Sequence, residues 1–306
     1  MTSTASVVSA AGLLVLVLFA TTYIGTLSSI ATYTRFKLES TWNDIYSLFP
    51  SEFAFHVFGT TFYAAFIFWF FNIFFLTIDF LQPKWAKAFK IQEKFTLTFA
   101  KFLTAVPRIL FNQFIVTLLV SFVFYYFYKL RVPNELEFPT FAKVIFDLTV
   151  SIFINELLFY YSHRAFHHPS IYKYIHKIHH EWTAPIGLVA IYAHPIEHIL
   201  SNVTPVALGP VICASHPFTI WLWYGLALFS TSVSHSGYHF PFLPSPEAHD
   251  YHHFAFTQNF GVLGILDLYH GTNKLFLKTA AYKRHFLSLS LVPVKKLYPE
   301  TTEKLK

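Results

Sequence analysis

Residues 163–180 read HRAFHHPSIYKYIHKIHH, which places six histidines within eighteen residues at the end of a strongly apolar run. Two sets in this stretch have helical spacing: His163 with His167, and His176 with His179 and His180. Residues three or four positions apart share a helix face, so we expect each set to project its imidazoles to one side. Imidazole nitrogen is a favoured ligand of Zn, Cu, Fe and Ni. The stretch therefore predicts a metal site.

Further histidine clusters lie later in the chain. HDYHH at 249–253 repeats the i, i+3, i+4 spacing of 176–180, and two more pairs are spaced i, i+4: His235 with His239, and His194 with His198. A single histidine on an apolar face is most often a hydrogen-bonded structural residue. Grouped triplets next to apolar spans are costly to desolvate and are typical of functional sites. A first-row metal ion takes four to six ligands, so eight to ten candidate histidines predict two ions side by side.

Few carboxylates accompany these histidines, which disfavours a di-iron site of the carboxylate-bridged bundle type. Five acidic residues lie beside the clusters: Glu156, Glu181, Glu197, Asp250 and Asp267. We interpret them as acceptors for ring N–H groups rather than as metal ligands. The alternative for each is an ordinary solvated or helix-capping charge.

The composition indicates a polytopic membrane protein. The chain has 306 residues, of which 54% are hydrophobic, 20% aromatic and 12% charged, and the mean hydropathy is +0.45. Cys213 is the single cysteine, so a disulfide framework and a cysteine-based metal site are excluded. The net charge of +6 comes from basic residues just outside apolar runs, at 84–108 and 274–306. That pattern follows the positive-inside rule and does not indicate nucleic-acid binding.

Apolar runs predict an all-α integral membrane protein, a transmembrane helical bundle with a cytosolic, histidine-rich cap that holds two metal ions. The expected spans lie at about 10–33, 53–80, 110–128 and 141–161, followed by a hairpin of runs 186–212 and 217–234. The basic loop at 84–108 is placed in the cytosol, with the character of a membrane-surface helix. By parity the histidine stretch is cytosolic as well.

Three ordered histidine motifs resemble the integral-membrane fatty acid hydroxylase and sterol desaturase superfamily: H-x3-H at 163–167, H-x2-H-H at 176–180 and H-x2-H-H at 249–253. The similarity covers roughly residues 140–278. It suggests three segments: 1–139 with N-terminal transmembrane helices and the basic cytosolic loop, 140–278 as the hydroxylase domain, and 279–306 as a basic tail. Further motifs most resemble the C4-methylsterol monooxygenases: YIHKIHH at 174–180, YAHPIE at 192–197, HSGY at 235–238, and Asp267 with Gly271-Thr272. Over the whole chain the resemblance is greatest to the group named fatty acid hydroxylase domain-containing protein 2.

The resemblance implies a ligand set for two iron ions, with zinc as a substitute and O2 as co-substrate. The implied catalytic and metal-binding residues are His163, His167, His176, His179, His180, His235, His249, His252 and His253, with His239 as a tenth metal ligand. Methylsterol oxidases usually carry an acid or amide at the position of His239, whereas fatty acid 2-hydroxylases carry histidine there. His194 matches a family position of less certain role, and His168 and His198 are interpreted as structural or as partners of ligands.

The implied function is hydroxylation of a lipid in the endoplasmic reticulum membrane, with a multi-pass chain and an active site that faces the cytosol. The first candidate reaction is oxidation of a sterol C4 methyl group. The alternatives are fatty acyl 2-hydroxylation, sterol side-chain hydroxylation and sterol desaturation. The chain has no glycine-rich nucleotide motif, so the family supplies the expected electron donors, cytochrome b5 and its reductase. A hypothesis of another class is a non-catalytic metal-binding membrane protein, such as a zinc transporter or a regulator.

Overall fold

A computed structural model describes residues 26, 28–134 and 136–299 of the chain. All regular elements in these residues are helical, and an isolated β-bridge joins Lys90 and Tyr238. The predicted all-α class is therefore confirmed for the part of the chain that is described.

The chain divides into two compact units, Met1–Ser51 and Glu52–Lys306. In the first unit, residues 28–47 are helical, and most of the span predicted at about 10–33 lies outside the described residues. Helices from all three predicted segments, 1–139, 140–278 and 279–306, belong to the second unit. The three-segment division itself remains a prediction.

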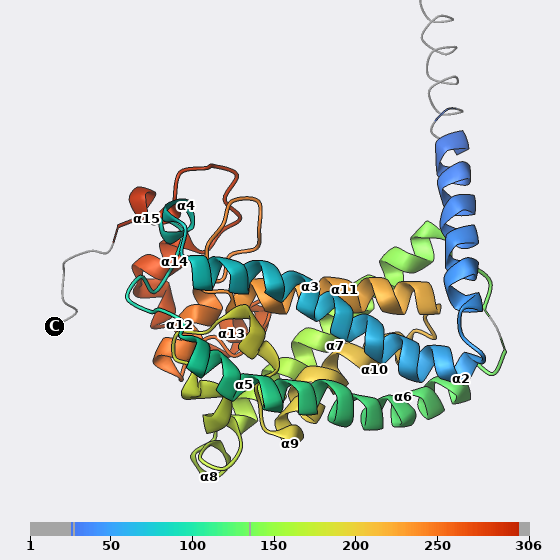
Figure 1. Cartoon of the computed structure of the whole chain (residues 1–306), viewed down its shortest axis with the longest axis horizontal. Coiled ribbons are helices and arrows are strands. Elements are labelled where there is room, and N and C mark those ends of the chain that lie inside the picture. Colours follow the sequence, from blue (N-terminus) through green and yellow to red (C-terminus); the bar gives the residue numbers. More distant parts are fainter. Residues whose placement is uncertain (1–25, 27, 135, 300–306) are drawn as a thin grey trace, which may run out of the picture. The chain divides into compact units, whose positions relative to one another are not determined.

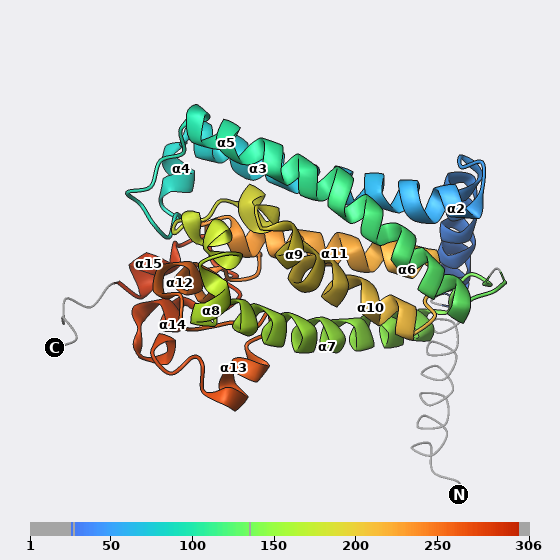
Figure 2. The same cartoon turned by 90° about the horizontal axis from the view of Figure 1, so that it is seen from below.

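The second unit carries the helices that position the histidines. In chain order they are α2 (Glu52–Ala54), η1 (Phe55–Gly59), α3 (Thr60–Leu81), α4 (Lys84–Lys87), α5 (Phe99–Phe111), η2 (Asn112–Val116), α6 (Thr117–Arg131), α7 (Phe141–Phe166), α8 (Pro169–Tyr172), η3 (His176–Glu181), η4 (Gly187–Ile191), α9 (Pro195–Glu197), η5 (His198–Val203), α10 (Thr204–Ile212), α11 (Pro217–His235), α12 (Glu247–Ala255), α13 (Ile265–His270), η6 (Phe276–Lys278), α14 (Ala280–Arg284) and α15 (Val294–Leu297). The long helices α3, α6, α7, α10 and α11 lie alongside one another, and α8 and α12 to α15 gather at one end (Figures 1 and 2).

Two continuous helices of the described residues are long and apolar enough to cross a membrane: Glu52–Leu81 and Phe99–Arg131. The first agrees with the span predicted at about 53–80. The second begins well before the predicted start near residue 110, because the Thr98 side chain caps it by accepting a hydrogen bond from the Lys101 backbone N–H at 3.2 Å. Part of the predicted basic loop is therefore helical and continuous with this span.

The remaining predicted spans differ in detail. α7 continues beyond the predicted end at 161 and so reaches the first histidines. It carries Lys143, Asp147 and Glu156 and is not among the two candidate spans. The run at 186–212 is not one helix, because Pro195 lacks an N–H group and starts a new helix after the turn of η4. α11 agrees with the predicted run 217–234.

Close helix contacts hold α7, α10 and α11 in place beside the site. A Cβ atom at Gly209 on α10 would lie 2.6 Å from the Cα of Ser151 on α7. A Cβ atom at Gly187 would lie 2.9 Å from the backbone oxygen of Ser232 on α11 and would also collide with Asn72 Oδ1 on α3. Glycine at these two positions lets the backbones approach to distances that any other residue would prevent.

Candidate metal centre

Four segments bring nine histidines together at one end of the long helices. They are the end of α7, η3, the end of α11, and α12. The ligand nitrogens form two groups, within each of which all lie within 4.8 Å of one another. Site 1 consists of His163, His167, His176, His180 and His252, and site 2 of His179, His235, His249 and His253. All nine side chains were predicted from the sequence, and the fold places all nine in these two sites.

Site 1 is a convergence of five Nε2 atoms. His167 Nε2 lies 2.9 Å from His176 Nε2 and 3.2 Å from His180 Nε2. His252 Nε2 lies 3.2 Å from both His167 Nε2 and His180 Nε2. His163 Nε2 completes the group at 3.2 Å from His176 Nε2. Four of the five residues are buried.

Site 2 is built in the same way beside site 1. His249 Nε2 lies 2.8 Å from His235 Nε2 and 3.1 Å from His253 Nε2. The ring of His179 has its centroid 4.8 Å from that of His253. The two sites adjoin, since the ring centroids of His180 in site 1 and His253 in site 2 are also 4.8 Å apart.

Oxygen atoms behind the rings fix which nitrogen faces inward. Backbone carbonyls accept hydrogen bonds from four Nδ1–H groups: His163 to Phe260 at 2.8 Å, His252 to Gln258 at 2.7 Å, His179 to Tyr192 at 3.2 Å and His235 to Thr231 at 2.9 Å. His176 Nδ1 lies 2.8 Å from Glu197 Oε1. A neutral imidazole carries one proton, so Nδ1–H behind the ring leaves the Nε2 lone pair directed into the site.

Burial keeps these imidazoles uncharged. Desolvation lowers the pKa of His163 and of His179 to about 4, and that of His235 to about 3. Neighbouring imidazoles lower the pKa of the same groups further, because two adjacent imidazolium ions repel one another. At neutral pH the site therefore presents neutral nitrogen donors, which is the state that binds a metal.

The two sites fit metal ions by both geometry and chemistry. Unprotonated nitrogens that face one another at about 3 Å repel unless a cation lies between them. With a metal–nitrogen bond of about 2.1 Å, neighbouring ligands are about 3.0 to 3.4 Å apart. The Nε2 separations of 2.8 to 3.2 Å agree closely with that spacing. Sites of five and four nitrogens suit two first-row ions, as the ligand count predicted.

The prediction that each histidine triplet projects from one helix face is wrong. His176 and His180 belong to site 1 and His179 to site 2, and on α12 His252 belongs to site 1 while its neighbour His253 belongs to site 2. Adjacent helical residues point in directions more than a quarter turn apart, so an HH pair faces two sites rather than one. Each triplet therefore contributes histidines to both sites, so η3 and α12 each link site 1 to site 2.

Four of the histidines singled out in the sequence lie outside both groups. His239 has Nδ1 3.3 Å from Glu247 Oε1 and Nε2 3.1 Å from the Phe286 carbonyl oxygen. His198 is bonded through both nitrogens, to Thr117 and to Asn202. His194 and His168 cap short helices, each accepting a backbone N–H two residues ahead. The structure thus does not bring His239, the tenth predicted ligand, to the metal sites.

The five carboxylates near the clusters have different roles. Glu197 lies against the ring of His176, as predicted. Glu156 and Asp267 accept backbone N–H bonds from the loop that follows Phe260. They thereby position the Phe260 carbonyl that orients His163, an indirect role that spacing along the sequence does not reveal. Glu181 accepts from the Tyr192 hydroxyl at 2.9 Å, and Asp250 from Gln92 at 3.1 Å.

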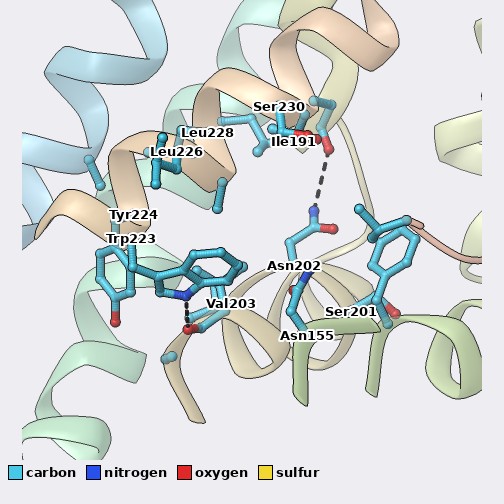
Figure 3. Close-up of a pocket in the computed structure, with 18 of the residues that line it drawn as sticks. Asn155, Ile191, Ser201, Asn202, Val203, Trp223, Tyr224, Leu226, Leu228 and Ser230 are labelled. Atoms are coloured by element: carbon cyan, nitrogen blue, oxygen red, sulfur yellow. Dashed lines mark hydrogen bonds between the residues drawn. The ribbon is translucent and has the colours of Figure 1, made fainter. Parts of the chain in front are cut away.

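A cavity of about 510 Å³ extends from site 2 along the long helices. His235 and His249 form part of its wall at one end, and His56 and Tyr128 form part at the other. Along α11 the lining extends from Ile220 to His235, or about 22 Å of helical rise. Figure 3 shows the apolar side chains of Trp223, Leu226 and Leu228 on its wall, together with a small number of polar groups.

Comparison with known proteins agrees with the histidine pattern. Residues 148–272 match the family described as fatty acid hydroxylase. Fatty acid hydroxylase domain-containing protein 2 of Homo sapiens is 45% identical over 242 residues, which cover 78% of this chain and 73% of that protein. Fatty acid hydroxylase ahd1 of Mycosarcoma maydis is 36% identical over 197 residues, covering 64% of this chain and 51% of its own.

A sterol enzyme is among the relatives. C-4 methylsterol oxidase erg25 of Schizosaccharomyces pombe is 40% identical over 139 residues, covering 42% of this chain and 46% of that protein. No solved structure matches the chain. The identity to the human protein extends over most of both chains, and the family match contains all the histidines of both sites. The chain therefore belongs to the fatty acid hydroxylase family, as its histidine motifs predicted.

Proposed function

We propose that the protein is an O2-dependent di-iron lipid hydroxylase, with a sterol C4 methyl group as its first candidate substrate. The observation that carries this proposal is the junction of two neutral histidine sites with one long apolar cavity. His235 and His249 belong both to site 2 and to the cavity wall. A lipid in the cavity would thus end at the metal-binding nitrogens.

The nine histidines of the two sites would hold two iron ions, and zinc would occupy the same nitrogens as a substitute. When bound, the irons supply the oxygen chemistry needed to oxidise an unactivated C–H bond. The chain's own groups orient and insulate that chemistry. Backbone carbonyls keep four of the nine rings in one tautomer, Glu197 lies against a fifth, and the apolar wall excludes water from the reacting end of the lipid.

The outer surface supports placement in a bilayer. Phe62, Phe66 and Phe70 on α3 are each at least 60% exposed, and further exposed apolar side chains lie on α6 and α7. We propose a multi-pass protein of the endoplasmic reticulum membrane whose histidine-rich end forms a cap in the cytosol. The basic residues at 84–108 and 274–306 support this orientation. There the cap would meet cytochrome b5 and its reductase as electron donors.

The substrate class rests on the relatives. The Schizosaccharomyces pombe relative is named for C-4 methylsterol oxidation, and the Mycosarcoma maydis relative for fatty acid hydroxylation. Sterol C4 oxidation is our first choice because the motifs at 174–180, 192–197 and 235–238 resemble the methylsterol enzymes. Acyl 2-hydroxylation, sterol side-chain hydroxylation and desaturation are the alternatives that the same test separates.

The test is reconstitution of the full chain in lipid nanodiscs with iron, cytochrome b5, its reductase, NADH and O2. The probes are 4,4-dimethylcholesterol and a long-chain ceramide, and products are identified by mass spectrometry. We expect a C4 hydroxymethyl sterol, and its loss in His179→Ala. If a 2-hydroxylated ceramide is the only product, fatty acyl 2-hydroxylation replaces sterol C4 oxidation as the proposed reaction. Full iron loading with no oxidised product from either lipid would favour a non-catalytic metal-binding protein.

A further inference from the structure

A polar band crosses the wall of the cavity where two π-helical turns meet. These turns are η2 in the α5–α6 helix and η5 in the α9–α10 helix. They carry Asn112, His198 and Asn202, and Thr117 follows η2 directly. A π-turn changes which side chains face a neighbouring helix and is frequent at functional sites. Here the two turns join three polar side chains, those of Thr117, His198 and Asn202, and the backbone carbonyl of Asn112 into one hydrogen-bonded chain.

The donors and acceptors in this chain have a single consistent order. The Thr117 hydroxyl donates its one proton to the backbone carbonyl oxygen of Asn112 at 3.0 Å. Its oxygen must then accept from His198 Nε2–H, at 2.9 Å. A neutral His198 with its proton on Nε2 has an unprotonated Nδ1, which accepts from Asn202 Nδ2 at 3.3 Å. The network thus assigns both the histidine tautomer and the orientation of the Asn202 amide.

This order leaves one atom of Asn202 unused. The second Nδ2 proton is directed to the Ala190 carbonyl oxygen at 3.4 Å, the upper of the two dashed lines in Figure 3. Asn202 Oδ1 therefore remains as an acceptor with no hydrogen-bond partner among the described residues. Asn155 approaches it from α7 and likewise has no hydrogen bond to another described residue. Both side chains line the cavity (Figure 3).

We propose that Asn155 and Asn202 form a hydroxyl-binding site in the cavity wall, and that the lipid which enters carries a hydroxyl group. That hydroxyl donates to Asn202 Oδ1 and accepts from Asn155 Nδ2. Asn202 Oδ1 can only accept a hydrogen bond, and the Asn155 amide can donate one. Together they suit a hydroxyl group, which both donates and accepts. The proposal names the substrate class of the same cavity and rests on the proposed lipid hydroxylase function but not on C4 as the oxidised carbon, although binding itself requires neither iron nor reductant.

The site holds the lipid at a defined depth. Asn155 precedes His163 by eight residues on α7, about 12 Å of helical rise, so the hydroxyl is bound along the cavity and not at the metal-binding nitrogens. Because C4 of a sterol is bonded to the carbon that carries the 3-hydroxyl, a sterol bound in this way presents a carbon remote from C4 to the histidines, as side-chain hydroxylation requires. A lipid that lacks the hydroxyl would leave Asn202 Oδ1 and the Asn155 amide unpaired beside apolar groups. Sites built in this way discriminate strongly, because the penalty for unpaired polar groups adds to the lost hydrogen bonds.

Competition binding to the full chain in nanodiscs tests the proposal. The radiolabelled probe is cholesterol, and the unlabelled competitors are cholesterol and its 3-methyl ether, which cannot donate to Asn202. We expect cholesterol to compete at least about tenfold more strongly than the ether. Octadecanol and octadecane, competed against radiolabelled octadecanol, form the second pair. A hydroxyl preference in the first pair indicates a sterol and in the second a long-chain alcohol, and either supports the site.

Two leucine variants test whether the preference for the hydroxyl lipid arises at Asn155 and Asn202. In Asn155→Leu and Asn202→Leu the ratio between hydroxyl and ether should fall to about one, while binding of the ether changes less than about threefold. Ser201→Ala is the matched control, because Ser201 lines the same cavity but its hydroxyl already donates to Ser162 Oγ at 2.8 Å. In Ser201→Ala the ratio between hydroxyl and ether binding should stay at the wild-type value. Each variant is checked by size-exclusion chromatography before binding is measured.

The proposal is overturned if neither pair shows a hydroxyl preference, or if Asn155→Leu retains it. Because these measurements need no turnover, they are independent of the lipid hydroxylase assignment. A chain that keeps the hydroxyl preference and oxidises no lipid overturns only the proposed function. A chain that hydroxylates a lipid without this preference overturns only the hydroxyl site.

Discussion

Two kinds of buried histidine occur in this protein, and only one kind has the geometry of metal ligands. In sites 1 and 2 the Nε2 atoms converge on one another, with oxygen acceptors behind several of the rings. His198 and His239 are equally buried, but both nitrogens of each face protein partners. The number of nitrogens left unengaged by the protein, rather than burial or spacing, separates a ligand from a structural histidine.

The pair His235 and His239 makes this difference clear. The two residues have the i, i+4 spacing of a metal-binding helix, yet α11 ends at His235. Gly237 then adopts φ +72°, which turns the chain out of the helical path. His239 is carried away to Glu247 and Phe286, while His235 stays at site 2. Helical spacing therefore has meaning only where the helix continues.

The largest effect is expected from removing a convergent nitrogen. His252 is fully buried and lies next to both His167 and His180 in site 1. In His252→Ala we expect the iron content to fall from about two ions to about one per chain, and hydroxylase activity to fall at least about 100-fold. Metal analysis of the monodisperse protein measures the first, and product formation the second. Retention of both ions would contradict the assignment of five nitrogens to site 1.

A smaller effect is expected from the oxygen behind a ligand. Glu197 is buried and lies 2.8 Å from His176 Nδ1, so Glu197→Ala removes the group that orients this ring. Loss of such an outer partner typically weakens metal binding about 10- to 100-fold. A chelator titration should show this loss for one ion and not for the other. Glu181→Ala is the matched control, because that carboxylate accepts from the Tyr192 hydroxyl and should leave both affinities unchanged.

Acidification should destabilise the metal-free protein. Burial lowers the pKa of His163 and His179 to about 4, and that of His235 to about 3, whereas in the unfolded chain each lies near 6.5. Between these values the unfolded state binds more protons, so stability falls as the pH decreases from about 6.5 toward 4. Each group contributes up to about 1.4 kcal/mol per pH unit in this range.

The measurement is the unfolding temperature of chelator-treated protein across this pH range, with iron-loaded protein as the comparison. Bound metal competes with protons for the same nitrogens, so the loaded protein should keep its unfolding temperature to lower pH. Equal pH dependence with and without metal would show that the nine nitrogens are not the groups that titrate.

Much of the fold followed from patterns that are local in sequence. The helices at 52–81 and 217–235 agree with apolar runs, because burial in a helix bundle or in lipid needs long uninterrupted apolar stretches. The break at 192–194 was missed. An apolar run does not show where Pro195 begins a new helix after a 3-10 turn. The early start of the second span at Phe99 depended on a single capping side chain, Thr98.

The nine histidines that converge were also predictable, but their division between the two sites was not. Nine histidines in spaced motifs indicate metal binding because few other uses explain so many neutral donors together. Which site each joins depends on tertiary contacts such as the Phe260 carbonyl behind His163 and the Gln258 carbonyl behind His252. These acceptors are backbone atoms, so no side-chain motif marks them. The same limit applies to Asn155 and Asn202, which line the cavity from separate helices.

The smallest effect is expected at His239, and it is the sharpest test of the difference between the two kinds of histidine. In His239→Gln the new amide can still donate to Glu247, but the bond to the Phe286 carbonyl is lost, at a cost of about 1 kcal/mol in the free energy of unfolding. Metal content and activity should stay at wild-type values, because neither ring nitrogen faces a site. If instead one ion were lost, His239 would be a tenth ligand, and a histidine engaged at both nitrogens would have to rotate to bind metal.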